Sequence, residues 1–162
     1  FLEGNHEARI SKYLHNYAPA VAGLVPSLEQ LLGFEEYEVT YCAQPYQICD
    51  NLLAIHGNKL STSQNSAGQS AFKERMRHGQ SIVQGHSHRA GLIADTQGEK
   101  RFYSMECGHL MDISQAGYLD FNGVANWQQA FGLIRIDGGT AFPSIHYIDD
   151  GRATVDGYWV YG

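Results

Sequence analysis

The chain reads LLAIHG at residues 52–57 and SIVQGHSH at residues 81–88, and these two stretches decide the fold. The continuous apolar run over residues 52–55 is typical of a strand that is buried on both faces of a sheet. Residues 81–84 predict the next strand. Each predicted strand runs directly into glycine and histidine, so the same two stretches also carry the first candidate site residues.

Helices and further strands are expected on both sides of these stretches. The polar residues 61–70 predict a mobile loop, and a helix at about residues 71–77 would place Phe72 and Met76 on one face. Upstream we expect the end of a strand at 1–4, helices at 7–17 and 26–32, and strands at 37–41 and 46–48. Downstream we expect strands at 91–95, 101–107, 131–136, 144–148 and 158–161. The predicted fold class is α/β, with an α+β-like antiparallel part: sheets packed as a sandwich with flanking helices.

Composition leaves the function open. The chain has 162 residues, 43% of them hydrophobic and 17% charged, which is enough for one domain with a sizeable core. No apolar run approaches the roughly 20 residues that cross a bilayer, so we expect no membrane partner. The net charge of −6 argues against a broad nucleic-acid-binding face. A nucleic-acid substrate stays open, because bound divalent cations would supply positive charge. Three cysteines without a CxxC pair favour a reducing compartment.

Three motifs share one placement, a loop that follows a predicted strand. They read GNHE at residues 4–7, HG at 56–57 and GHSH at 85–88. In α/β sheets, ligands bind at this edge because several loops converge there. The motifs therefore predict a polar site made from distant parts of the chain.

The GHSH motif carries two histidines with metal-binding chemistry. Neutral imidazole is a common ligand for divalent transition metals. In an extended segment the side chains of His86 and His88 leave from the same side, so they could hold one ion each or the same ion. Gly85 would let the backbone turn sharply and approach the site closely. Two polar histidines in a surface turn are the alternative.

The other two motifs offer complementary chemistry. His56 ends a buried apolar strand, where a core histidine with satisfied nitrogens is the alternative to a ligand. The amide oxygen of Asn5 can complete the coordination of a metal, and His6 can donate a proton to a departing oxygen. Alternatively, Asn5 is a helix cap and Glu7 stabilises the positive end of its helix.

Taken together, the order, residue types and placement of these motifs resemble the calcineurin-like metallophosphoesterases. The later signature blocks of that family are GNH followed by Asp or Glu, then a histidine, then GHxH. Segments at 66–73, 88–89 and 126–132 look like those of bacteriophage-encoded members. For Trp127 and Phe131, core packing is the favoured interpretation.

The resemblance implies two-metal hydrolysis of a phosphoester. By similarity, Asn5, His56 and His86 would hold one divalent ion and His88 would belong to the other. His6 would be the catalytic residue that faces the substrate. Manganese, iron or zinc would suit such a site, with manganese favoured. No substrate-binding residue follows from the sequence.

The family's earlier blocks, Asp-x-His and Gly-Asp-x-x-Asp, do not occur in this chain. We therefore expect residues 1–162 to be a single partial domain that lacks its N-terminal part and cannot complete a two-metal site alone. An upstream half in a longer enzyme is the favoured partner. A complementing chain, or a remnant that no longer catalyses, are the alternatives. Loss of upstream strands would expose a sheet edge to pairing.

The leading hypothesis is a phosphodiesterase, with nucleic acid as a candidate substrate, in the cytoplasm of a bacterial host or phage-infected cell. Alternatives are a phosphomonoesterase like the protein serine/threonine phosphatases, or a non-catalytic binding or assembly module. The remaining histidines are assigned no site role: His15, His78, His109 and His146. Of these, His109 in the CGH triplet is the one that could reach a site.

Overall fold

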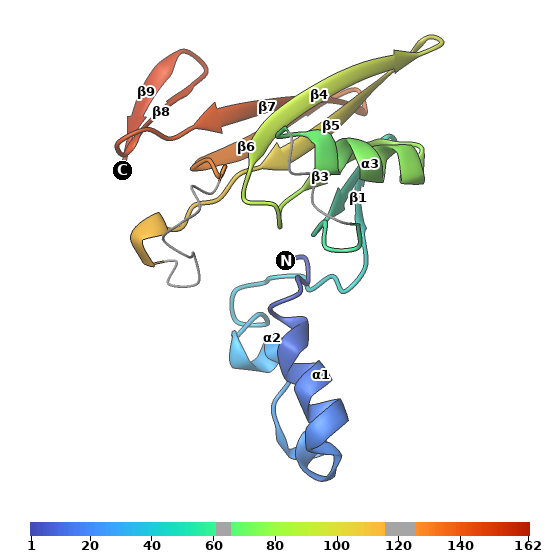
Figure 1. The fold of residues 1–162 in the computed structure, drawn as a ribbon, viewed down its shortest axis with the longest axis vertical. Coiled ribbons are helices and arrows are strands. Elements are labelled where there is room, and N and C mark those ends of the chain that lie inside the picture. The colour runs from blue at the N-terminus through green and yellow to red at the C-terminus, as the bar shows by residue number, and fades with distance from the viewer. Residues whose placement is uncertain (61–65, 116–125) are drawn as a thin grey trace. The chain divides into compact units, whose positions relative to one another are not determined.

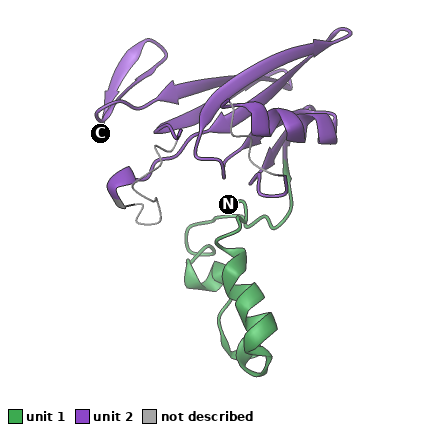
Figure 2. Cartoon of the chain, in the orientation of Figure 1, with its two compact units in different colours: residues 1–46 green, residues 47–162 purple. Residues whose placement is uncertain are grey.

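The computed structural model describes residues 1–60, 66–115 and 126–162. The chain forms two compact units, residues 1–46 and residues 47–162 (Figures 1 and 2). The second unit holds nearly all of the sheet structure. The helices of the first unit are joined by turns and irregular segments.

A five-stranded mixed sheet organises the second unit. Its order is β1-β2-β3-β5-β4, and β2, β3 and β5 are parallel neighbours, whereas β4 runs antiparallel to β5. The strands are β1 (Tyr46–Cys49), β2 (Leu52–Ile55), β3 (Ser81–Gln84), β4 (Ala90–Gln97) and β5 (Lys100–Cys107). The mixed α/β class expected from the sequence is confirmed.

The centre of the sheet is buried on both faces. Every residue of β2 and of β3 is buried, as the apolar run at 52–55 predicts. Leu53, Ile55 and Ile82 form a core cluster with Ala71 of α3 (Gln69–His78), the helix that covers this face (Figure 1). The strand prediction for residues 81–84 is correct to the residue.

The buried face of α3 is polar, which the sequence pattern does not indicate. Met76 is 55% exposed, whereas Glu74 and Arg75 are almost fully buried. Arg75 makes an ion pair of 2.6 Å with Asp95, and its guanidinium lies 4.0 Å over the ring of Phe102. The ion pair and the stacking offset part of the cost of burying the guanidinium, and the charged side chain rather than the methionine faces the sheet.

A second layer of strands packs against the first. The hairpin of β6 (Ala130–Asp137) and β7 (Thr140–Tyr147) contacts β4 and β5. A Cβ at Gly132 would come within 2.7 Å of Met105 Cε and 3.0 Å of Cys107 Sγ, so β6 lies close to the side chains of β5 at this point. This packing is the expected sandwich of sheets.

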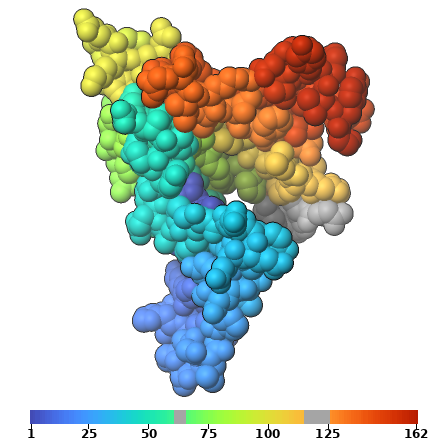
Figure 3. Space-filling model, turned by 180° about the vertical axis from the view of Figure 1, so that it is seen from behind, coloured from blue at the N-terminus to red at the C-terminus, as the bar shows by residue number. Residues whose placement is uncertain are grey.

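The last strands form a separate hairpin, β8 (Arg152–Val155) and β9 (Tyr158–Tyr161). All four residues of β9 are exposed, and the hairpin lies on the surface of the molecule (red in Figure 3). A short helical turn, η2 (Ile113–Gln115), follows β5.

The first unit contains α1 (Ala8–Tyr17), η1 (Pro19–Leu24) and α2 (Leu28–Leu31). The expected first helix is correct within one residue, but its predicted apolar face is not buried: Ile10 is 44% and Tyr17 75% exposed. The second helix starts later than expected because Ser27 caps it. Ser27 exchanges hydrogen bonds with Gln30 in a capping box.

The strand expected at residues 37–41 is wrong. A turn at residues 37–38 is followed by irregular backbone at 39–41, and Glu38 has a left-handed backbone with φ of 53°. Only Cys42, one residue further, pairs with Leu2 in an isolated parallel bridge. The ring of Tyr41 instead stacks 6.3 Å from Phe1, so its aromatic character serves packing rather than a sheet.

Within the residues that the structure describes, no helix is long and apolar enough to cross a membrane.

Replacing Ile82 by alanine should lower the free energy of unfolding by about 2–4 kcal/mol, because a fully buried side chain leaves a cavity at the centre of the sheet. The matched control is Ile136→Ala, since Ile136 is 49% exposed on β6 and should cost less than about 1 kcal/mol. Urea unfolding followed by circular dichroism measures both. Equal losses would contradict the assigned core.

Candidate functional site

Histidines follow three adjacent parallel strands at the same edge of the sheet. His56 follows β2, His86 and His88 follow β3, and His109 follows β5. Because β2, β3 and β5 are parallel neighbours, their carboxyl ends meet at one edge, where α/β proteins bind ligands. The topology thus brings the HG and GHSH motifs together.

The rings of His56 and His86 lie side by side. Their centroids are 5.0 Å apart with an angle of 61° between the planes. Two imidazoles that bind one tetrahedral ion through nitrogens about 2.1 Å away place their centroids roughly 5 Å apart. This pair therefore fits the joint binding of one transition-metal ion.

The GHSH segment is not extended, which corrects the expectation that His86 and His88 leave from the same side. Both residues have left-handed backbones, with φ of 62° and 57°. Left-handed geometry is costly for residues with a Cβ and is found where surrounding structure enforces it. As a result the two rings have different neighbours: His86 lies beside His56, whereas His88 packs 4.4 Å from Trp127.

Gly57 permits a close approach between two parts of the chain. A Cβ at Gly85 would meet no protein atom within 4 Å, so the close approach to a bound ligand that is expected there stays a prediction. Gly57 has φ of 102°, and a Cβ on it would come within 2.9 Å of Gln84 Cδ. The HG loop therefore folds tightly onto the end of β3.

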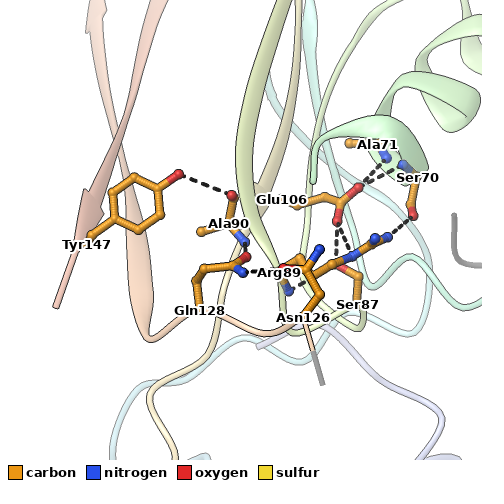
Figure 4. A network of polar contacts seen from close by, with 9 residues as sticks. All are labelled: Ser70, Ala71, Ser87, Arg89, Ala90, Glu106, Asn126, Gln128 and Tyr147. Carbon is orange, nitrogen blue, oxygen red and sulfur yellow. Dashed lines mark hydrogen bonds and ion pairs between the residues drawn. The ribbon is translucent and has the colours of Figure 1, made fainter. Parts of the chain in front are cut away.

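A buried carboxylate, Glu106 at the end of β5, holds the GHSH loop (Figure 4). Its Oε2 accepts a 2.6 Å hydrogen bond from the hydroxyl of Ser87, the residue between the two histidines. Its Oε1 accepts from the backbone N–H groups of Ser70 and Ala71, at 2.7 and 3.3 Å, at the start of α3. One carboxylate thus joins a helix N-terminus to the candidate site.

Arg89 completes this network from the other side of the loop. It is 4% exposed, its Nε lies 3.7 Å from Glu106 Oε2, and its Nη2 donates to Ser70 Oγ at 3.3 Å. A buried carboxylate opposite a buried guanidinium keeps both charges compensated. Sequence reasoning missed this pair, although a glutamate ending a predicted strand and an arginine after GHSH were visible signals.

Residues 126–130 line the same edge. The N–H of Gln128 donates to the carbonyl of His88 at 3.1 Å, and its Oε1 accepts from the N–H of Ala90 at 3.0 Å. The hydroxyl of Tyr147 donates to the carbonyl of Ala90 at 3.2 Å (Figure 4). Trp127, expected in a core, is half-buried against His88 instead.

Asn5 and His6 belong to the first unit, in the turn that leads into α1. Asn5 is half-buried and His6 is exposed. Glu7 occupies the N-cap position without a side-chain cap bond, and its Oε2 accepts from the N–H of Gly4 at 2.9 Å. The expected alternative of Asn5 as the cap does not hold. The hydrogen bond between Gly4 and Glu7 stabilises the turn that contains Asn5 and His6.

Within the described parts of the chain, no group of three or more histidine, cysteine, aspartate or glutamate side chains is placed to hold a metal ion. The fit to a metal therefore rests on the His56–His86 pair.

The second unit also contains a shielded thiol beside the candidate site. Burial is the main cause that raises the pKa of Cys107 from 9.0 to about 11, and the charge of Glu106 adds to it. A backbone hydrogen bond with Gly132 acts in the opposite direction.

No protein-family model matches the chain. It is similar to proteins encoded by mycobacteriophages. The Gene 54 protein of Mycobacterium phage D29 is 37% identical over 164 residues, with 96% of this chain and 64% of the relative covered. The Gene 54 protein of Mycobacterium phage L5 is 37% identical over 163 residues, with 96% and 63% covered. The chain thus spans less than two thirds of the length of these relatives.

Solved structures with weaker likeness include Vacuolar Protein Sorting 29 from Cryptosporidium parvum, with a TM-score of 0.45 and 17% identity. That match covers 74% of this chain and 56% of the other. Vps29 from Entamoeba histolytica, complexed with Zn²⁺, has a TM-score of 0.38 and 17% identity, with 74% and 58% covered.

Replacing Glu106 by glutamine should lower the free energy of unfolding by about 3 kcal/mol, because it leaves the buried Arg89 charge uncompensated. The histidine ring signals of His86 and His88 should shift in the NMR spectrum, since the amide has one acceptor oxygen where the carboxylate serves both Ser87 and the N–H groups of α3. Glu99→Gln, at an exposed turn, is the matched control and should change neither quantity. Unchanged stability in Glu106→Gln would contradict the network.

Cys107 should react with iodoacetamide at a rate that rises toward pH 11, because the thiolate is the nucleophile. The folded pKa lies above the ordinary value. The stability that Cys107 contributes is therefore complete below pH 9 and is lost as the pH rises through about 11. Mass spectrometry of the Cys107 peptide gives the rate, and the urea-unfolded chain is the control. If the pH midpoint of the reaction rate is as low in the folded chain as in the unfolded chain, the Cys107 thiol is not shielded.

Proposed function

We propose that the chain is part of a metal-dependent phosphoester hydrolase of the calcineurin-like metallophosphoesterase superfamily. The observation that carries the proposal is the pair of His56 and His86 rings at 5.0 Å, delivered by the HG and GHSH motifs from adjacent parallel strands. Imidazole suits manganese, iron or zinc, the ions that the resemblance implies. The GNHE motif adds an amide and an imidazole of matching chemistry.

Each residue has a separate task in this proposal. His56 and His86, with the amide oxygen of Asn5, hold one divalent ion, and His88 binds at the second position. His6 faces the substrate and gives a proton to the departing oxygen. When bound, the two ions supply a water-derived nucleophile at neutral pH and charge stabilisation for the phosphate. Manganese is the favoured ion.

The proposed substrate is a phosphodiester, and nucleic acid is the favoured candidate because the relatives are phage proteins. The protein would act in the cytoplasm of a phage-infected bacterial cell. A partner, either an upstream half in the same polypeptide or a complementing chain, would supply carboxylate ligands that are not found among the described residues of this chain.

A binding or assembly module is the second candidate. The observation that favours it is the exposed apolar surface of α1 in the first unit, where Tyr13 and Tyr17 are 61% and 75% exposed. Exposed apolar patches of this kind mark surfaces that bind other chains.

Hydrolysis of bis-p-nitrophenyl phosphate with Mn²⁺ tests the proposal, for this chain and for a form extended at its amino terminus through the carboxylate-bearing blocks. We expect activity in the extended form alone. There, His6→Ala and His86→Ala should each lower kcat by about 100-fold or more. His15→Ala, an exposed histidine on α1, is the control and should leave kcat unchanged. An extended form that binds metal and hydrolyses neither mono- nor diesters would refute catalysis and favour the binding module.

A further inference from the structure

His109 occupies a fixed place in the row of strand ends that carries the candidate site. It follows β5, the strand that pairs with β3, just as His86 and His88 follow β3. Its N–H donates to the carbonyl of Gln128 at 3.2 Å, and its carbonyl accepts from the N–H of Ala130 at 3.1 Å. Two backbone bonds of this kind hold the residue in one position.

Glycine at position 108 lets this segment approach its neighbour. Gly108 has φ of 76°, and a Cβ on it would come within 2.7 Å of the carbonyl oxygen of Gln128. Its N–H donates to the carbonyl of Arg89 at 2.8 Å. The CGH triplet is therefore fastened to the end of the GHSH loop, and His109 is held beside His88.

Three rings form one compact group at this point. The centroid of His109 lies 6.0 Å from that of His88 and 6.2 Å from that of Trp127. Trp127 in turn lies 4.4 Å from His88, with its plane at 74°. The indole therefore contacts both imidazoles in an edge-type arrangement, and the three rings lie in one place.

The Nδ1 atom of His109 is shielded from solvent and has no hydrogen-bond partner among the residues that the structure describes. Buried polar atoms in native proteins are nearly always bonded, so this nitrogen calls for a polar partner. The neighbouring ring belongs to a residue that the proposed function assigns to an ion. A divalent transition metal is a partner that imidazole nitrogen prefers.

We propose that His109 is a further metal ligand, and that it binds the same divalent ion as His88. The inference rests on the proposed function, and it assigns to the second ion a nitrogen donor that lies within this chain. The observed centroid separation of 6.0 Å is about 1 Å wider than the roughly 5 Å that two imidazoles adopt on one tetrahedral ion. On binding one ion, the two rings would have to approach each other by that difference.

The test is a titration of the 162-residue chain with Zn²⁺ alone, followed by long-range ¹H–¹⁵N NMR of the histidine rings. Ring nitrogens that bind the ion change their resonance positions, so each histidine reports for itself. We expect the signals of His109 and His88 to move together, over the same range of Zn²⁺ concentration. The signals of His15, exposed on α1, should stay in place and serve as the internal control.

A variant adds a second readout. In His109→Ala, the midpoint of the His88 shift should move to a Zn²⁺ concentration about tenfold higher or more, whereas His15→Ala should not move it. Movement of His88 without movement of His109 in the unaltered chain overturns this inference and leaves the proposed function standing. If His88 and His109 both fail to respond, this inference is overturned, and the proposed function is decided separately by the hydrolysis assay of the extended form.

Discussion

The candidate site depends on the hydrogen bonds and the ion pair that the carboxylate of Glu106 makes. It is fully buried at the end of β5, and it binds the first N–H groups of α3, the hydroxyl of Ser87 and the guanidinium of Arg89. A helix N-terminus and a buried cation both favour a negative charge at this point. The same charge holds Ser87, so the residues on either side of it keep left-handed backbones that an unsupported loop would avoid.

Packing and polar bonding reinforce each other around this carboxylate. Helix α3 covers the sheet through Ala71, and its buried Arg75 pairs with Asp95 on β4. The position of α3 thereby sets the position of the N–H groups that bind Glu106. Residues 126–130 line the edge of the sheet. Gln128 forms hydrogen bonds with the backbone of His88 and of Ala90, the first residue of β4. The catalytic proposal thus requires a rigid scaffold, and the described residues supply one.

Much of the second unit could be predicted from the sequence because its strands are short apolar runs with clear ends. The limits of β3 are correct to the residue, and the five predicted strands after it differ from the observed ones by up to four residues, whereas β8 (Arg152–Val155) was not predicted. The placement of HG and GHSH at one sheet edge followed from the same pattern. What failed was local backbone geometry: left-handed residues at His86 and Glu38 come from tertiary contacts that no propensity records.

The missed site residues share a physical cause. Glu106 and Arg89 look like ordinary charged residues in the sequence, since their burial arises from pairing across segments far apart in the chain. Trp127 looks like a core residue because it is large and apolar, yet its position against His88 depends on the route of residues 126–130. Arg75 is buried on the face of α3 that was expected to be apolar. Its guanidinium pairs with Asp95 and lies over the ring of Phe102.

The central claim is that His56 and His86 bind one ion together. A double-mutant cycle on Zn²⁺ affinity, measured by isothermal titration calorimetry on the chain and on His56→Ala, His86→Ala and the double variant, tests it most directly. If both rings bind the same ion, removing one already breaks the chelate, so the double variant should lose clearly less binding free energy than the two single losses summed. Strictly additive losses, or single variants with unchanged affinity, would contradict the account.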